Sequence, residues 1–185
     1  MNTHGSLEEA RAELRRLEEP LVRALKDRGG FLRGQPSQGV RHHPEVEPRL
    51  AGCYDREIVP FLCAAGSDDR EDACAAADGR LLELLARRVR LGVLVADAKA
   101  RDEPERFAFL VAAGNRASLA AALTNGDVER QVLERVRLLA RPAGGPPEPA
   151  VIVEIFERWI IPLTKEAEVD RLLTSRPGGT QTDAG

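Results

Sequence analysis

Aromatic residues and lysines are scarce in this chain. Aromatics form only 4% of its 185 residues, whereas hydrophobic residues form 43% and charged residues 31%. A chain of this size is too apolar to be wholly disordered and can bury a full core, which must consist of Leu, Ala and Val. Only three of the 27 basic residues are lysines, namely Lys26, Lys99 and Lys165. The 30 acidic residues are interleaved with the arginines, which argues against nucleic-acid binding.

Cysteines are few, and motifs for metals or cofactors are missing. The odd set Cys53, Cys63 and Cys74 contains no CxxC pair, so we expect buried, inert thiols rather than disulfides or a zinc site. His42 and His43 are adjacent and would point apart in any regular structure, which does not suit a metal site. The sequence has no glycine-rich phosphate loop and no nucleophile motif. We therefore expect neither a metal nor a cofactor.

Long apolar runs are also missing. The apolar stretches are far shorter than the roughly 18 residues that a membrane-spanning helix requires. The N-terminal segment becomes charged and amphipathic at once, unlike a signal peptide. We expect a cytoplasmic protein that does not associate with membranes.

Hydrophobic periodicity predicts an all-α fold, a helical bundle with one long central helix. Leu and Ala recur at three- and four-residue steps over residues 7–26. The proline-free stretch 69–101 is rich in Ala, Leu and Arg and predicts the central helix, whose apolar part at 91–96 should be buried on every side. Further helices are predicted at residues 54–65, 104–113, 117–123, 125–140 and 150–174, with interruptions at Pro60 and Pro162.

Three segments are predicted to lack helices. Residues 28–53 are rich in Gly and Pro and suggest a loop, and residues 142–149 suggest a linker. The tail at 176–185 lacks a hydrophobic cluster and should be disordered. We therefore predict a single helical domain over residues 1–175.

The informative residues are polar ones on apolar helix faces, because a bundle core normally excludes charge. Arg88 and Lys99 are eleven residues apart and so share one face of the central helix, with Gly92 and Val95 between them. This stripe suits an elongated anion lying along the helix. The alternative is that both side chains extend to solvent and that Gly92 marks a helix crossing.

The other polar candidates also have ordinary explanations. Arg11 could pair with Glu8, and Asn125 could be a helix N-cap with Glu129 as a solvated first-turn acid. Thr164 could bond a carbonyl freed by Pro162, with Glu168 paired to Arg171.

Taken together, these positions resemble the all-helical (AroQ-type) chorismate mutases, specifically the larger yeast and plant subgroup. The pattern R-R-x-x-x-G-x-x-V-A-x-x-K in the central helix and the C-terminal I-P-x-T-K-x-x-E-V are the most specific matches. The blocks that carry the resemblance are LEEARAELRRLEEPLVRAL, YDREIVPFLC, LLARRVRLGVLVADAK, LTNGDVERQVLERV and ERWIIPLTKEAEVDRLL.

The resemblance implies an isomerase that converts chorismate to prephenate in Phe, Tyr or related aromatic biosynthesis, without metal or cofactor. The substrate is a dianion with an enol-pyruvyl ether, and the reaction is a rearrangement within one molecule. The matching positions imply that Arg88, Lys99 and Glu168 are catalytic. They imply substrate binding by Arg11, Arg88, Lys99, Asn125, Glu129, Thr164 and Glu168.

The implied roles follow the chemistry of the substrate. Arg11 and Arg88 match the residues that bind the two carboxylates, which guanidinium groups hold bidentately, and Thr164 matches a further carboxylate ligand. Asn125 and Glu129 match the pair around the ring hydroxyl. Lys99 and Glu168 match the pair at the ether oxygen, where negative charge develops.

Glu168 can donate a hydrogen bond to that ether oxygen only when it is protonated. We therefore expect burial to raise its pKa.

The chain also departs from the larger family members, which have a long regulatory insertion where this chain has only residues 31–53. A regulatory Thr aligns with Ala76, so we expect no strong activation by Trp or inhibition by Tyr. The matched segments imply a site built within one chain, and the resemblance implies a homodimer.

Two other functions remain open from the sequence. An isochorismate pyruvate-lyase-like enzyme would use a similar cationic groove. A non-catalytic helical protein would instead turn Arg11, Arg88 and Lys99 towards solvent or a partner.

Overall fold

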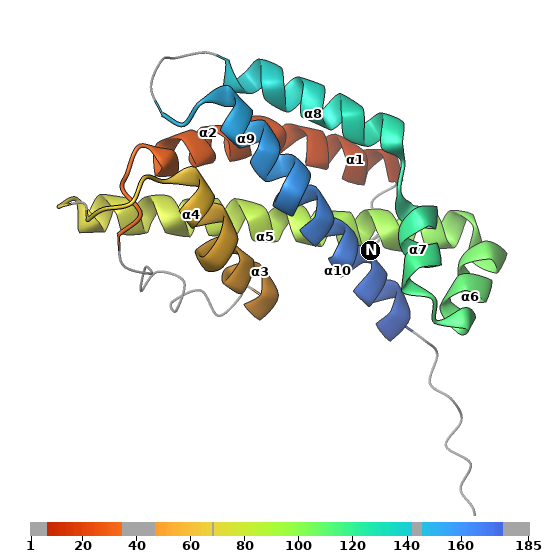
Figure 1. The fold of residues 1–185 in the computed structure, drawn as a ribbon. Helices are drawn as coiled ribbons and strands as arrows, with labels where there is room; N and C mark the ends of the chain where they lie inside the picture. Colours follow the sequence, from red (N-terminus) through yellow and green to blue (C-terminus); the bar gives the residue numbers. More distant parts are fainter. Residues whose placement is uncertain (1–6, 35–46, 68, 142–145, 176–185) are drawn as a thin grey trace, which may run out of the picture.

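The computed structural model describes residues 7–34, 47–67, 69–141 and 146–175, and these residues contain helices but no strand. The all-α prediction is confirmed. The central helix α5 (Glu71–Asp102) runs through the molecule, and helices from both the N-terminal and the C-terminal parts of the chain pack along it (Figure 1). The predicted tail at 176–185 and the two histidines at 42 and 43 lie outside the described residues.

Composition explains the length of α5. The helix has no proline, is dense in Ala, Leu and Arg, begins with Glu71 and Asp72, and carries Lys99 and Arg101 in its last turn. These charges complement the helix dipole at both ends. One detail of the prediction is wrong, because the 91–96 stretch is not buried on every side. Leu94 is 48% exposed, so this side of α5 is open among the residues that the structure describes.

The predicted first helix is divided in two. Helix α1 (Leu7–Arg16) is followed after Leu17 by α2 (Glu18–Gly29). Pro20 accounts for the break, because its nitrogen cannot donate to the Arg16 carbonyl four residues earlier.

Two later prolines shape two longer helical segments. Helix α3 (Pro48–Cys53), the π-helical turn η2 (Tyr54–Ile58) and α4 (Val59–Leu62) follow one another directly, with Pro60 in α4. Likewise α9 (Pro149–Ile155), the π-helical turn η3 (Phe156–Ile160) and α10 (Ile161–Thr174) are continuous, with Pro162 in α10. The predicted interruptions are thus π turns just before each proline. The loop prediction is wrong at Pro48–Cys53, where Pro48 provides a good helix start.

The chain between α5 and α9 forms α6 (Pro104–Ala113), α7 (Arg116–Leu123) and α8 (Gly126–Ala140). Gly114 ends α6 in the left-handed conformation, with φ of 63°, which glycine adopts without strain. Asn115 caps α7 and Asn125 caps α8 through their side-chain oxygens.

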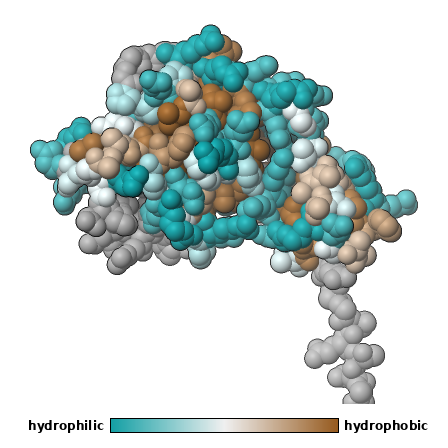
Figure 2. All heavy atoms as spheres, in the orientation of Figure 1, coloured by the Kyte–Doolittle hydropathy of each residue, from teal (hydrophilic) through white to brown (hydrophobic). Residues whose placement is uncertain are grey.

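The helices enclose two apolar clusters. The larger one joins α2, the α3–α4 segment, α5, α8 and the start of the α9–α10 segment. The smaller one, which includes Ala96, Phe107 and Leu172, lies where α6 and α7 cover the ends of α5 and α10. Hydrophilic side chains cover most of the face in Figure 2, with hydrophobic patches between them. Within the described part of the chain, no helix is long and apolar enough to cross a membrane.

A buried polar cluster joins the helices at the start of α5. The Asp78 carboxylate accepts hydrogen bonds from the Arg28 guanidinium and the Tyr54 hydroxyl, and all three side chains are essentially inaccessible to solvent. Arg28 also donates to the Leu32 and Arg33 carbonyls, each at 3.2 Å. The cluster ties α2, η2 and α5 together at the end of α5 opposite Lys99.

Candidate active site

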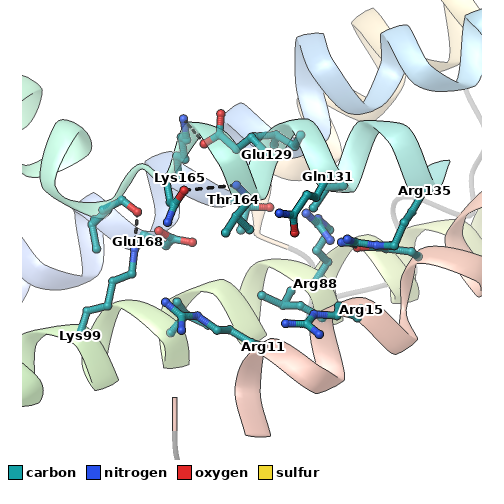
Figure 3. Close-up of a pocket in the computed structure, with 18 residues that line it drawn as sticks. Arg11, Arg15, Arg88, Lys99, Glu129, Gln131, Arg135, Thr164, Lys165 and Glu168 are labelled. Carbon is teal, nitrogen blue, oxygen red and sulfur yellow. Dashed lines mark hydrogen bonds and ion pairs between the residues drawn. The ribbon is translucent and has the colours of Figure 1, made fainter. Parts of the chain in front are cut away.

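A cavity of about 240 Å³ lies between α1, α5, α8 and α10. All seven residues that the sequence singled out line it, and they come from four separate helices and a cap (Figure 3). They are Arg11, Arg88, Lys99, Asn125, Glu129, Thr164 and Glu168.

Arg88 is the most deeply placed cation of the cavity. It is 6% exposed, its guanidinium lies 5.8 Å from the centre of the Phe156 ring, and burial lowers its pKa against the opposing effects of Glu18 and Glu168. Its Nε has no hydrogen-bond partner among the described residues. The alternative in which Arg88 extends to solvent is therefore wrong. A buried, unsatisfied donor is costly unless a ligand supplies an acceptor.

Lys99 and Arg11 face the other half of the cavity. The Lys99 ammonium donates to the Leu123 carbonyl at the end of α7, and partial burial lowers its pKa while Glu168 opposes this effect. Arg11 is one-third exposed and its Nη1 lies 2.8 Å from Glu8. The expected Arg11–Glu8 pair therefore forms, and Arg11 still reaches the cavity wall (Figure 3).

Gly92 allows α10 to approach α5 at the cavity. A Cβ at position 92 would lie 2.3 Å from Thr164 Cγ2 and 3.0 Å from Glu168 Oε1. Gly92 thus marks a helix crossing, and the crossing helix carries two of the predicted site residues. The Thr164 hydroxyl donates to the Ile160 carbonyl at 2.8 Å, four residues earlier.

Glu168 is buried among charged groups on several helices. Desolvation raises its pKa to about 7, against the lowering effects of Lys99, Arg88 and Lys165, and Glu129 raises it further. The alternative in which Glu168 pairs with Arg171 is wrong, because the Arg171 Nε lies 3.2 Å from the Asp97 carboxylate.

Asn125 and Glu129 lie at the start of α8. The Asn125 side-chain oxygen accepts from the Asp127 and Val128 amides, as expected for an N-cap. Asn125 also lines the cavity. The Glu129 carboxylate is not simply solvated, because its Oε1 lies 2.6 Å from Lys165 Nζ.

The sequence analysis missed five charged or polar residues that line the cavity. Glu18 is 3% exposed and accepts two hydrogen bonds from Arg135, both at 2.7 Å. These residues are 117 positions apart, so no local pattern could have paired them. The sequence did contain a feature that could have singled out Lys165, because it is one of only three lysines in the chain. The five residues are Arg15, Glu18, Gln131, Arg135 and Lys165.

The cavity carries excess positive charge in a chain whose net charge is −3. Six cationic side chains and three carboxyl groups line it. A partly enclosed site of this kind attracts a small polyanion and holds it through charge-assisted hydrogen bonds. No group of three potential metal-ligating His, Cys, Asp or Glu side chains occurs in the described ranges.

The fold and the site define a helical protein with a cavity that is lined mainly by cationic side chains and lies between several helices. Comparison with known proteins identifies its class more closely: residues 72–169 match the family "Chorismate mutase type II". The chain is 36% identical over 143 residues to the chorismate mutase of Pichia angusta, covering 69% of this chain and 51% of that protein. The chain belongs to the chorismate mutase type II family. It spans about half the length of the curated relatives it matches.

Solved structures share the fold over most of the chain. The Aro7p chorismate mutase of Candida albicans, solved in complex with L-Trp, has a TM-score of 0.79 at 21% identity and covers 91% of this chain and 90% of its own. The chloroplast chorismate mutase of Zea mays has a TM-score of 0.79 at 23% identity, covering 94% and 96%.

Proposed function

We propose that this protein converts chorismate to prephenate. The observation that carries the proposal is the convergence of Arg11, Arg88 and Lys99 from two helices on one cavity. Family membership supports it, and so does the cationic excess of the cavity. The reaction requires a dianion to be held in a compact conformation while one C–O bond breaks and one C–C bond forms.

The arginines bind the two carboxylates. Arg88 approaches from within the bundle and Arg11 from the cavity rim, so that the substrate lies along the face of α5. The unpartnered Nε of Arg88 gains an acceptor on binding. Thr164 contributes its hydroxyl to one carboxylate, and Asn125 and Glu129 hold the ring hydroxyl. Fixing the reactive conformer in this way lowers the barrier by orientation.

Lys99 and Glu168 act on the ether oxygen. Its negative charge grows as the C–O bond breaks, and a compact ammonium placed beforehand stabilises that charge without reorganisation. Glu168 donates a second hydrogen bond in its protonated form. Its pKa of about 7 keeps much of this form at neutral pH, and the carboxylates of a bound dianion raise the pKa further.

Two alternatives make different predictions. A non-catalytic interaction protein requires the cations to face solvent or a partner, whereas Arg88 is buried at the cavity. An isochorismate pyruvate-lyase would share the cationic cavity, so the test is made with both substrates. Purified protein should remove chorismate absorbance and form prephenate, and isochorismate should be turned over far more slowly. Preferential pyruvate release from isochorismate would support the alternative.

We also propose that the protein acts in the cytoplasm as a homodimer, in Phe and Tyr supply or related aromatic biosynthesis. Family membership supports the biosynthetic role, the resemblance to the larger yeast and plant enzymes supports the homodimer, and a relative named as cytosolic supports the cytoplasm. Ultracentrifugation of the purified protein, at concentrations spanning those of the assay, tests the oligomeric state.

A further inference from the structure

Lys165 is a cavity residue that the roles above do not use. It directly follows Thr164 in the I-P-x-T-K segment, and its Nζ lies 2.6 Å from Glu129 Oε1 (Figure 3). Two of the three lysines in a chain that otherwise uses arginine line this cavity, namely Lys99 and Lys165. Lys165 thus adds a further positive charge to the cavity.

The ion pair connects α8 to α10 at the cavity. The Glu129 and Lys165 side chains are 30% and 28% exposed, so the pair is neither deeply buried nor freely solvated. Glu168 lies one turn beyond Thr164 on α10 and is also within the influence of the Lys165 charge. A single ammonium therefore forms an ion pair with Glu129 and acts on Glu168 only through its charge. The proposed reaction needs these two carboxyl groups in opposite protonation states. Glu129 must accept a hydrogen bond from a hydroxyl, and Glu168 must donate one.

We propose that Lys165 is a positioning residue: by pairing with Glu129 it fixes that carboxylate as an acceptor facing the cavity and leaves Glu168 free to hold its proton. The inference rests on the proposed function and adds a role for a residue outside the seven predicted ones. If the Lys165 ammonium paired with Glu168 instead, it would favour the ionised form of Glu168. Glu129 and Glu168 would then both be ionised, and Glu168 could not donate a hydrogen bond.

The charges around Glu168 give the inference a measurable signature. Lys99 and Arg88 on α5 and Lys165 on α10 all lower its pKa, whereas Glu129 on α8 raises it. Removing the Lys165 charge should therefore move the Glu168 titration to higher pH. Removing the Glu129 charge should move it to lower pH. Removing an exposed ion pair that does not act on Glu168, such as Arg130–Asp127, should leave this titration unchanged.

The experiment has two readouts. Carboxyl carbon NMR of glutamate-labelled protein follows the Glu168 titration, with the resonance assigned by its loss in Glu168→Gln. Steady-state kinetics with chorismate are measured across the same pH range. The variants are Lys165→Met, Lys165→Arg and Glu129→Gln. The matched control is Arg130→Met, which removes the exposed Arg130–Asp127 pair in the first turn of α8.

We expect Lys165→Met to raise KM about tenfold with little change in kcat at low pH, because an oriented hydrogen bond to a charged group is lost from ground and transition state alike. The Glu168 titration should move up in Lys165→Met and down in Glu129→Gln. Lys165→Arg keeps the positive charge and should resemble the wild type in both readouts. Arg130→Met should change neither readout.

An unchanged Glu168 titration in Lys165→Met overturns the inference, and so does an unchanged KM in an active enzyme. If the wild-type protein does not transform chorismate, the proposed function fails instead. The NMR titrations still report whether Lys165 separates the two acids.

Discussion

Gly92 of α5 lies directly beneath Thr164 of α10, so close that a methyl group at position 92 would be 2.3 Å from Thr164 Cγ2. In an ordinary helix interior, alanine would be favoured over glycine by about 1 kcal/mol. Here the steric overlap outweighs that gain, because both neighbouring atoms belong to a packed helix that also carries Glu168.

Replacing Gly92 with Ala should therefore push α10 away from α5. Overpacking of this kind costs about 1–3 kcal/mol, so we expect net destabilisation together with a clear loss of activity. Denaturant unfolding and chorismate kinetics measure both effects. Gly30→Ala is a suitable control, because a Cβ there meets nothing closer than 3.4 Å. Full activity in Gly92→Ala would show that the close approach is not required.

The pH dependence of activity should follow the protonation of Glu168. Its pKa is raised to about 7 by burial, and the protonated form is the hydrogen-bond donor. The value of kcat/KM, which reports the free enzyme, should thus be full below this pKa and fall about tenfold per pH unit above it. Glu168→Gln keeps a donor that does not titrate and should flatten the profile. If that variant loses activity over the same pH range, Glu168 is not the titrating group.

The buried Arg28–Asp78 pair should be important for stability rather than for catalysis. Removing one partner of a buried ion pair leaves an uncompensated charge and costs about 3–5 kcal/mol. We expect Asp78→Ala to lower the free energy of unfolding by this order, as measured in denaturant. An exposed pair contributes less than about 1 kcal/mol, so Arg130→Ala should have a small effect. Comparable losses in the two variants would contradict this account of the cluster.

Regulation by aromatic amino acids should be weak. The resemblance implies that Ala76 stands where the larger family members have a regulatory Thr, and that residues 31–53 replace a longer regulatory insertion. Titration of Trp and of Tyr into the assay at subsaturating chorismate should change the rate little. Strong activation by Trp or inhibition by Tyr would show that an effector site exists despite these departures.

Periodicity predicted much of the fold. The central helix, its Arg88–Lys99 stripe and the order of the later helices follow from local propensity and apolar spacing. The break at Leu17 and the helix at Pro48–Cys53 were not predicted, because each depends on whether a proline starts or interrupts a helix in its packed context.

The cavity was only partly predictable. The seven residues known from the family pattern could be named, and the structure brings them together. The Glu18–Arg135 pair could not, since it joins helices that are adjacent only in the folded chain. The exposure of Leu94 was missed for the same reason: an apolar run does not show which of its sides a neighbouring helix will cover.

The central claim is that the cations around this cavity promote the rearrangement of chorismate. The most direct test compares loss of chorismate absorbance for the wild-type protein and Lys99→Ala, with circular dichroism as a check on folding. We expect activity in the wild type and a reduction in kcat of about 10²–10³ in the variant, because a donor at the developing negative charge is removed. A folded wild-type protein that leaves chorismate unchanged, or a Lys99→Ala variant as active as the wild type, would contradict it.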